Sequence, residues 1–204
     1  QREIKNIMLF LQGHDVSTSH VSKIYKTYGE NSIAVVQENP YRLADDIGGI
    51  GFHTADTIAQ KLGFDRAKPV RLRSGLLYTI NKLSEEGHCY ATREMLLKTG
   101  TDLLDVEETL LSSVLDEMIL AEDVKTEAIP ESGEDAIYLP PFFFSEIGTA
   151  RRLREIFSAP KKVSVEREGL ENRIREKTGM VYDESQKKAI LTAVESKILI
   201  LTGG

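Results

Sequence analysis

The sequence predicts a mostly α-helical protein with a small α+β region in its middle and a helical tail. Three observations support this fold class. Apolar residues recur at helical spacing from residue 4 to about residue 118. Two strand-like runs, 119–129 and 136–139, flank a turn-rich segment. A continuous apolar run, 197–201, follows another helical segment and is typical of a strand buried in a parallel sheet.

Composition limits the cellular setting and the partners. The 204 residues, 41% of them apolar, suffice for one large domain or two small ones. The one cysteine, Cys89, excludes a disulfide framework and has no partner residues for a metal site. No apolar run approaches the ~20 residues of a membrane span and no signal peptide is visible, so we expect a cytoplasmic protein without a membrane partner. Net charge is −6, but the acidic excess lies in residues 65–140, which leaves both ends open to phosphate.

The first third of the chain has the pattern of a series of short helices. Ser17 is a suitable N-cap for the second of them, and Gly29 and Gly63 are natural stops for the second and the last. The predicted helices cover residues 4–13, 18–28, 33–36, 41–43 and 54–62.

Two of these helices and the turns before them repeat one another at a constant offset of 34 residues. A period of this size can signal a helical solenoid, but two copies are too few for one. The first copy consists of Val16, Ser17, Val21, Ile24, Tyr25, Tyr28 and Gly29, and the second of Ile50, Gly51, Ala55, Ile58, Ala59, Leu62 and Gly63.

The second copy opens with a glycine-rich turn at Gly49-Ile50-Gly51. Glycine tolerates positive φ, and a glycine pair at a helix start leaves N–H groups exposed where the helix dipole favours a phosphate. The spacing resembles the helix-hairpin-helix motif of DNA-binding and repair proteins, whose hairpin holds the nucleic-acid backbone without reading sequence. In the first copy Asp15 and Ser17 replace the glycines, so we expect the second hairpin to be the main contact. The candidate DNA-binding residues are Gly49, Ile50, Gly51, His53 and Thr54, with Ser17 and Thr18 in the first copy.

The middle of the chain has the element order of a winged helix, three helices followed by a β-hairpin. The first predicted helix carries Leu72 to Leu83, and the second runs from Thr92 to Leu97 and is ended by Gly100. Asp105 is expected to N-cap the third. The strands are the runs 119–129 and 136–139.

The charges of this region argue against base readout. The third helix and the hairpin are rich in carboxylates, which duplex DNA would repel. We therefore interpret the region as a packing or protein-contact module. A basic cluster just before it could extend a phosphate track and adds Arg71 and Arg73 to the candidate DNA contacts, although a solvated helix start explains it equally well. The cluster consists of Arg66, Lys68, Arg71 and Arg73.

The last third contains an apolar elbow at 140–144, a helix with three arginines, a linker at 158–162 and a charged helix ending at Gly179. Asp183 and Gln186 then form a predicted capping box at the start of another helix. The strand 198–201 and Thr202-Gly203-Gly204 have the form in which a P-loop begins, without its lysine.

The succession of these motifs looks like the N-terminal region of the RecD-like superfamily 1 helicases, of the bacterial type that is independent of RecB and RecC. The motifs are Asn39-Pro40-Tyr41-Arg42-Leu43, the glycine hairpin with Phe52-His53-Thr54-Ala55-Asp56, Gly75-Leu76-Leu77-Tyr78, Glu85-Glu86-Gly87-His88, Tyr138-Leu139-Pro140-Pro141, Asp183-Glu184-Ser185-Gln186 and Leu201-Thr202-Gly203-Gly204. The resemblance covers essentially the whole chain and implies a parent enzyme that is an ATP- and Mg²⁺-dependent 5′-to-3′ DNA helicase, similar to the α subunit of exodeoxyribonuclease V. It also implies nucleotide-binding roles in the parent for Gln186, Gly203 and Gly204.

The expected domain organisation follows from the motifs and the resemblance together. A tandem helix-hairpin-helix domain covers 1–66, a winged-helix-like domain 67–140, a helical linker region 141–180 and the truncated start of an ATPase motor domain 181–204. We expect a non-catalytic accessory region, with no metal or cofactor of its own, that binds single-stranded or junction DNA. The alternative is a protein-interaction scaffold whose acidic surface binds a partner such as a single-strand-binding protein. Because an unpaired apolar strand promotes association, we also expect the residues after about Met180 to be poorly ordered or to pack against another chain.

Overall fold

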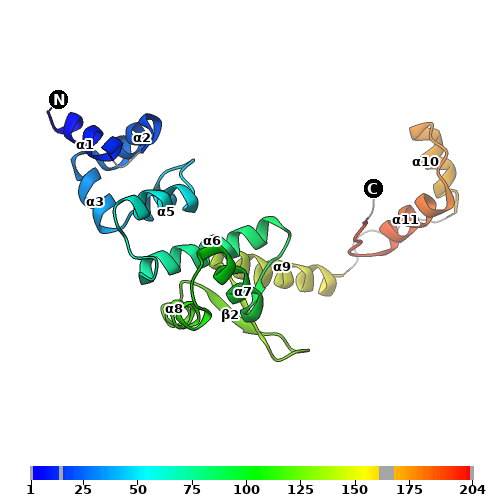
Figure 1. Cartoon of the computed structure of the whole chain (residues 1–204). Helices are drawn as coiled ribbons and strands as arrows, with labels where there is room; N and C mark the ends of the chain where they lie inside the picture. The colour runs from blue at the N-terminus through cyan, green and yellow to red at the C-terminus, as the bar shows by residue number, and fades with distance from the viewer. Residues whose placement is uncertain (1, 14–15, 161–167, 203–204) are drawn as a thin grey trace. The chain divides into compact units, whose positions relative to one another are not determined.

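The computed structural model describes residues 2–13, 16–160 and 168–202, in two compact units, Gln1–Phe143 and Phe144–Gly204. Over these residues the chain is mostly helical and contains a three-stranded antiparallel sheet. The first half of the first unit consists of short helices with a 3-10 turn (Figure 1). They are α1 (Arg2–Gly13), α2 (Thr18–Tyr28), the turn Gly29–Asn31, α3 (Ser32–Glu38), α4 (Arg42–Asp46) and α5 (Phe52–Lys61).

The 34-residue repeat is visible in the burial of its members. Val16 and Ile50, the apolar residues before α2 and α5, are both buried, as are Ile24 and Ile58 at matching positions in the two helices. Gly29 and Gly63 follow the two helices with positive φ, which lets the chain turn away at each helix end. The repeat therefore corresponds to two similar helix starts that are packed into one core.

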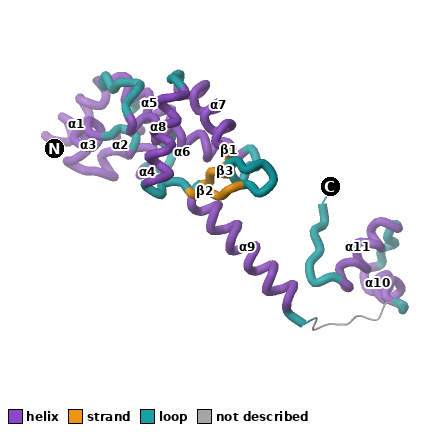
Figure 2. The backbone as a smooth tube through the Cα atoms, turned by 90° about the horizontal axis from the view of Figure 1, so that it is seen from below, coloured by secondary structure: helices purple, strands orange, loops and turns teal. Residues whose placement is uncertain are grey.

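The second half of the first unit is built on three longer helices and a small sheet. The helices are α6 (Pro69–Glu85), α7 (Arg93–Leu104) and α8 (Glu108–Leu120), and the strands are β1 (Ala91–Thr92), β2 (Lys125–Ala128) and β3 (Asp135–Tyr138). The sheet has the order β1-β3-β2 and is antiparallel throughout, with Ile137 of β3 opposite both Ala91 and Thr126 (Figure 2). Leucines along α6, α7 and α8 form the buried interior of this half.

The second of these helices is longer than the sequence prediction, and two boundary residues have other roles. Gly100 does not end a helix but lies inside α7, where a Cβ would come within 2.8 Å of the Leu111 side chain. The glycine is needed for the close packing of α7 against α8. Asp105 is not the N-cap of α8: it is the left-handed C-cap of α7, and Glu107 is the N-cap. Aspartate adopts the left-handed conformation more readily than most residues, which suits a C-cap as well as an N-cap.

Two further predictions are corrected. The run 119–129 is not one strand, because α8 continues to Leu120 and β2 begins only at Lys125. The apolar segment 140–144 is the first turn of α9 (Pro140–Ser158) rather than an elbow, since proline is well tolerated at a helix start. Part of the predicted linker 158–162 lies outside the described residues.

The second unit contains most of α9, with α10 (Leu170–Thr178) and α11 (Glu184–Glu195). The capping box at the start of α11 is confirmed: the Asp183 carboxylate accepts from the Gln186 N–H at 2.8 Å, and the Gln186 side chain accepts from the Asp183 N–H at 3.1 Å. The predicted strand 198–201 is absent, and Ile200 and Leu201 are exposed. A strand needs a neighbouring ladder, and the described part of this unit supplies none. Among the described helices, none has the length and apolar character needed to cross a membrane.

Candidate nucleic-acid interface

The second hairpin, which we define as residues 47–51, joins α4 to α5 through one tight turn. The Ile50 N–H donates to the Ile47 carbonyl at 3.0 Å, and Gly49 has a φ of +83°, which a residue with a side chain rarely adopts. Ile47 and Ile50 are buried, whereas Gly48, Gly49 and Gly51 are exposed. The two isoleucines thus fix the turn to the core and leave a glycine backbone on the surface.

The two helix starts of the repeat differ in their capping. At α2 the Ser17 side chain accepts from the His20 N–H at 3.3 Å and lies 3.2 Å from the Ser19 hydroxyl. At α5 the N-cap is Gly51, which has no side chain to cap the helix. The first N–H groups of an α-helix have no partner inside the helix. The start of α5 therefore presents uncapped donors at the positive end of the helix dipole, whereas the start of α2 is partly satisfied by its own serine.

A lysine from the first half of the repeat lies at the second hairpin. Lys23 of α2 donates from Nζ to the Gly48 carbonyl at 3.0 Å, and Nζ would be 2.8 Å from a Cβ placed on Gly49. Lys23 is exposed. An ammonium group has three donors, and one is used here. A positive charge and the exposed glycine backbone therefore occupy the same patch of surface.

The other sequence-predicted contacts surround the two helix starts. His53 is exposed, and Thr54 is half-buried in the first turn of α5. Thr18 is exposed and accepts a long hydrogen bond from the Gln12 amide at 3.4 Å. Five of the predicted contact residues lie together at the turn before α5 and in its first turn: Gly49, Ile50, Gly51, His53 and Thr54. Ser17 and Thr18 lie at the start of α2.

Arg71 is placed differently from the sequence expectation. Its side chain is buried, and its Nε and one terminal nitrogen donate to the two Asp56 carboxylate oxygens at 2.8 and 3.0 Å. The other terminal nitrogen donates to the Arg66 and Leu104 carbonyls. Tyr41 completes the network by donating to Asp56 at 2.7 Å. Arg71 has no accessible charge for DNA, and we remove it from the interface.

The other members of the basic cluster also have partners within the chain. Arg73 pairs with Asp123, and Arg66 pairs with Asp105 at 3.2 Å. The Lys68 ammonium lies 4.1 Å from the centre of the Phe64 ring. Each member of the cluster thus has a partner within the chain, and Arg66, Lys68 and Arg73 remain exposed. Arg73 is half-exposed, but its pairing with Asp123 weakens the case for a DNA contact.

The partly buried Asp56 predicts how stability depends on pH. Burial alone would raise the pKa of this carboxyl, but hydrogen bonds from Arg71 and Tyr41 outweigh it and hold the pKa below its usual value. A lowered pKa in the folded state stabilises the protein above about pH 4, the value for an unfolded aspartate, and this contribution is lost as the pH falls through the folded-state pKa. We expect urea unfolding to show a loss of stability below pH 4 that is smaller in Asp56→Asn. An equal loss in the two proteins would contradict the assignment.

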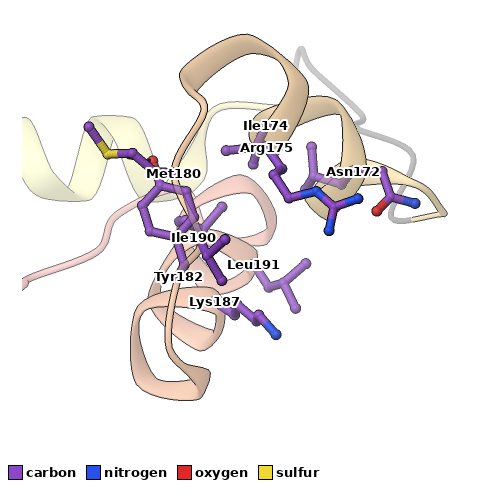
Figure 3. Close-up of a pocket in the computed structure, with 10 residues that line it drawn as sticks. Asn172, Ile174, Arg175, Met180, Tyr182, Lys187, Ile190 and Leu191 are labelled. Carbon is purple, nitrogen blue, oxygen red and sulfur yellow. Dashed lines mark hydrogen bonds between the residues drawn. The ribbon is translucent and has the colours of Figure 1, made fainter.

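The nucleotide-binding expectation concerns the second unit. Gln186 is engaged in the α11 capping box through its side-chain oxygen, and Gly203 and Gly204 lie outside the described residues. A small pocket of about 100 Å³ lies nearby (Figure 3). Its walls come from α10, the following segment and α11, and Gln186 is not among them; they include Arg175, Met180, Tyr182, Lys187, Ile190 and Leu191. In this structure the pocket is a packing gap between two helices.

Lys23 is a candidate interface residue that the sequence analysis did not select. Its contact joins positions 25 residues apart on different helices, and nothing in the local sequence distinguishes it from Lys26 of the same helix. The repeat could have indicated it, since it places α2 and α5 in similar positions around one core. Among the described residues, no group of three or more histidine, cysteine or carboxylate side chains could hold a metal ion.

Comparison with known protein families finds a match over the N-terminal part of the chain. Residues 1–90 match the family model described as the HHH domain of the ATP-dependent RecD2 DNA helicase. The matched segment contains both hairpins and continues through α6, so it includes the Asp56–Arg71 pair that joins α5 to α6.

Proposed function

We propose, from the premise that residues 1–90 belong to the helix-hairpin-helix family of RecD2 helicases, that this chain is a DNA-binding accessory region that grips the DNA backbone without reading sequence. The observation that carries the proposal is the uncapped start of α5 at Gly51, with the Lys23 ammonium beside the hairpin. Backbone N–H groups at a helix start and a lysine are the donors that a phosphate accepts. Contacts from these donors to phosphates carry no information about base sequence, which fits binding to the backbone alone.

The remainder of the chain fits the same proposal. The three helices with their β1-β3-β2 sheet have the element order of a winged helix, and we propose this fold for residues 67–140. Residues 141–180 would then be a helical linker, and 181–204 the start of the ATP-dependent motor, whose ATP and Mg²⁺ would belong to the parent helicase. The helix-hairpin-helix domain proper would end near residue 66, with α6 packed on both halves of the first unit.

The alternative is that the hairpins only pack and the chain binds a protein. Carboxylates are exposed on α8 and in the hairpin formed by β2 and β3. They include Glu108, Glu117, Glu127 and Glu134. This surface would suit a basic partner but not a duplex. The alternative predicts no DNA affinity even at low salt, so one binding experiment separates the two functions.

Introduction of a serine N-cap at α5 tests whether its first N–H groups bind the DNA backbone. Gly51→Ser gives α5 the cap that α2 already has, and the backbone of Gly51, with φ −94° and ψ 176°, accepts a side chain without strain. The serine hydroxyl would compete with phosphate for the same N–H groups, so we expect the affinity for DNA to fall about fivefold, equivalent to roughly 1 kcal/mol for one cap. Fluorescence anisotropy at low salt measures it. The chain should remain as stable as before or gain stability, because serine is the better cap.

Gly48→Ser is the matched control, since Gly48 lies in the same hairpin with open space around it but precedes the helix start. It should bind DNA as the unchanged chain does. Equal affinities for Gly51→Ser and Gly48→Ser would show that the α5 amides do not hold the backbone.

A further inference from the structure

Three aromatic rings form a column from the core to the surface beside the second hairpin. Tyr41 and Phe52 are buried and stack with ring centres 5.9 Å apart. Phe52 stacks in turn on Tyr78 of α6, with centres 5.3 Å apart and planes 22° from parallel. Tyr78 is half-buried and is the outer end of the column.

His53 lies beside the column rather than over its outer end. Its ring centre is 5.1 Å from that of Tyr78 and 5.9 Å from that of Phe52, and both contacts are edge-on. Because the three centre-to-centre distances are nearly equal, the rings form a triangle. A ring stacked over the outer face of Tyr78 would be much farther from Phe52, so His53 does not stack over that face.

Tyr78 also lines a surface groove of about 280 Å³ that begins at the hairpin. Gly51 and Phe52 form its hairpin end, and one face of α6 contributes Ser74, Asn81 and Lys82. The carboxylates of Asp45 and Glu85 lie on its wall. The start of α5 and an aromatic ring of α6 therefore line the same groove.

Two carboxylates and one ammonium group, that of Lys82, line the groove, and this acidic excess favours a base over a phosphate. Carboxylates repel a phosphate but accept hydrogen bonds from the amino and imino groups of nucleobases. An aromatic side chain provides a stacking surface that every base can use. In a duplex the bases are paired and stacked on one another, so only an unpaired base can enter.

We propose that this groove binds an unstacked nucleobase on Tyr78, next to the phosphate held at Gly49–Gly51, and that the domain thereby selects single-stranded DNA. The inference rests on the proposed backbone grip, which supplies the neighbouring phosphate. It adds a second contact of different chemistry, stacking on Tyr78, which requires that a base be present.

The test compares two single strands that differ only in their bases, and a duplex. The 204-residue chain is titrated by fluorescence anisotropy at low salt with an oligothymidylate, an abasic oligonucleotide of the same length and a duplex. We expect the oligothymidylate to bind about tenfold more tightly than the abasic strand, the size of one stacking contact. Tyr78→Leu should remove this difference and leave the abasic affinity unchanged, whereas Tyr78→Phe, which keeps the ring, should retain it.

Tyr90→Leu is the control for loss of an exposed tyrosine, because Tyr90 pairs with Tyr138 and does not line the groove. It should leave every affinity unchanged. Equal binding of the oligothymidylate and the abasic strand by the unchanged chain would overturn the groove while leaving the backbone grip intact. Failure to bind any of the three nucleic acids would overturn the proposed function and the groove with it.

Discussion

Replacement of Arg71 by leucine is expected to lower the free energy of unfolding by about 3–5 kcal/mol, the usual cost of leaving one member of a buried ion pair alone. Asp56 would lose two short hydrogen bonds, and the Arg66 and Leu104 carbonyls would each lose a donor. Tyr41 would still donate to Asp56 at 2.7 Å. Urea unfolding at pH 7, followed by circular dichroism, measures the loss.

The chain contains a matched control for this change. Arg66 pairs with Asp105 at 3.2 Å, but both side chains are mostly exposed, at 62% and 88% of their accessible surface. An exposed pair contributes about 0–1 kcal/mol, so Arg66→Leu should have little effect. Similar losses for the two variants would mean that Arg71 contributes no more than an ordinary surface pair.

The position of Arg71 also affects how cooperatively the first unit unfolds. It extends from α6 to α5 on one side and to the last carbonyl of α7 on the other. The side chain thus joins the hairpin half of the first unit to the half built on α6, α7 and α8. In Arg71→Leu we expect the two halves to unfold less cooperatively, with a lower dependence of stability on urea concentration.

The contrast between Arg71 and Lys23 shows which parts of the site the sequence could and could not predict. Helix periodicity, capping residues and the repeat depend on neighbours within a few positions, and they located the helices, the Ser17 cap and the glycine hairpin. Whether a basic side chain faces solvent or a buried carboxylate depends on packing between distant segments. Arg71 and Arg73 have the same charge and lie two positions apart, but α6 turns the first inward to Asp56 and the second toward Asp123.

The predicted helix boundaries in the middle of the chain were wrong for a related reason. Gly100 and Asp105 carry the composition of a helix stop and a helix start. Leu111 of α8 approaches so closely that position 100 has no room for a side chain, and the sequence near Gly100 does not indicate this contact. The prediction rested on the local conformational preference of each residue, whereas at Gly100 the small size of glycine decides.

Reversal of the charge at Lys23 is expected to weaken DNA binding about 30-fold at low salt, because it replaces one attraction of about 1 kcal/mol to a nearby phosphate with a repulsion of similar size. Lys23 does not belong to the core, and its ammonium group donates to the carbonyl of the exposed Gly48. Lys23→Glu should therefore fold with nearly unchanged stability. Loss of affinity could then be assigned to the interface rather than to unfolding.

Salt dependence separates a phosphate contact from a general effect of net charge. A lysine that neutralises one phosphate contributes about 0.7 to the slope of log affinity against log salt for single strands. Lys23→Gln should lower the slope by this amount, and Lys23→Glu should lower it further. Lys98→Glu, an exposed residue of α7, makes the same change in net charge without touching the hairpin, and it should shift affinity only slightly. If Lys98→Glu and Lys23→Glu weakened binding equally, the position of Lys23 beside Gly48 would carry no function, and the grip would consist of the α5 amides alone.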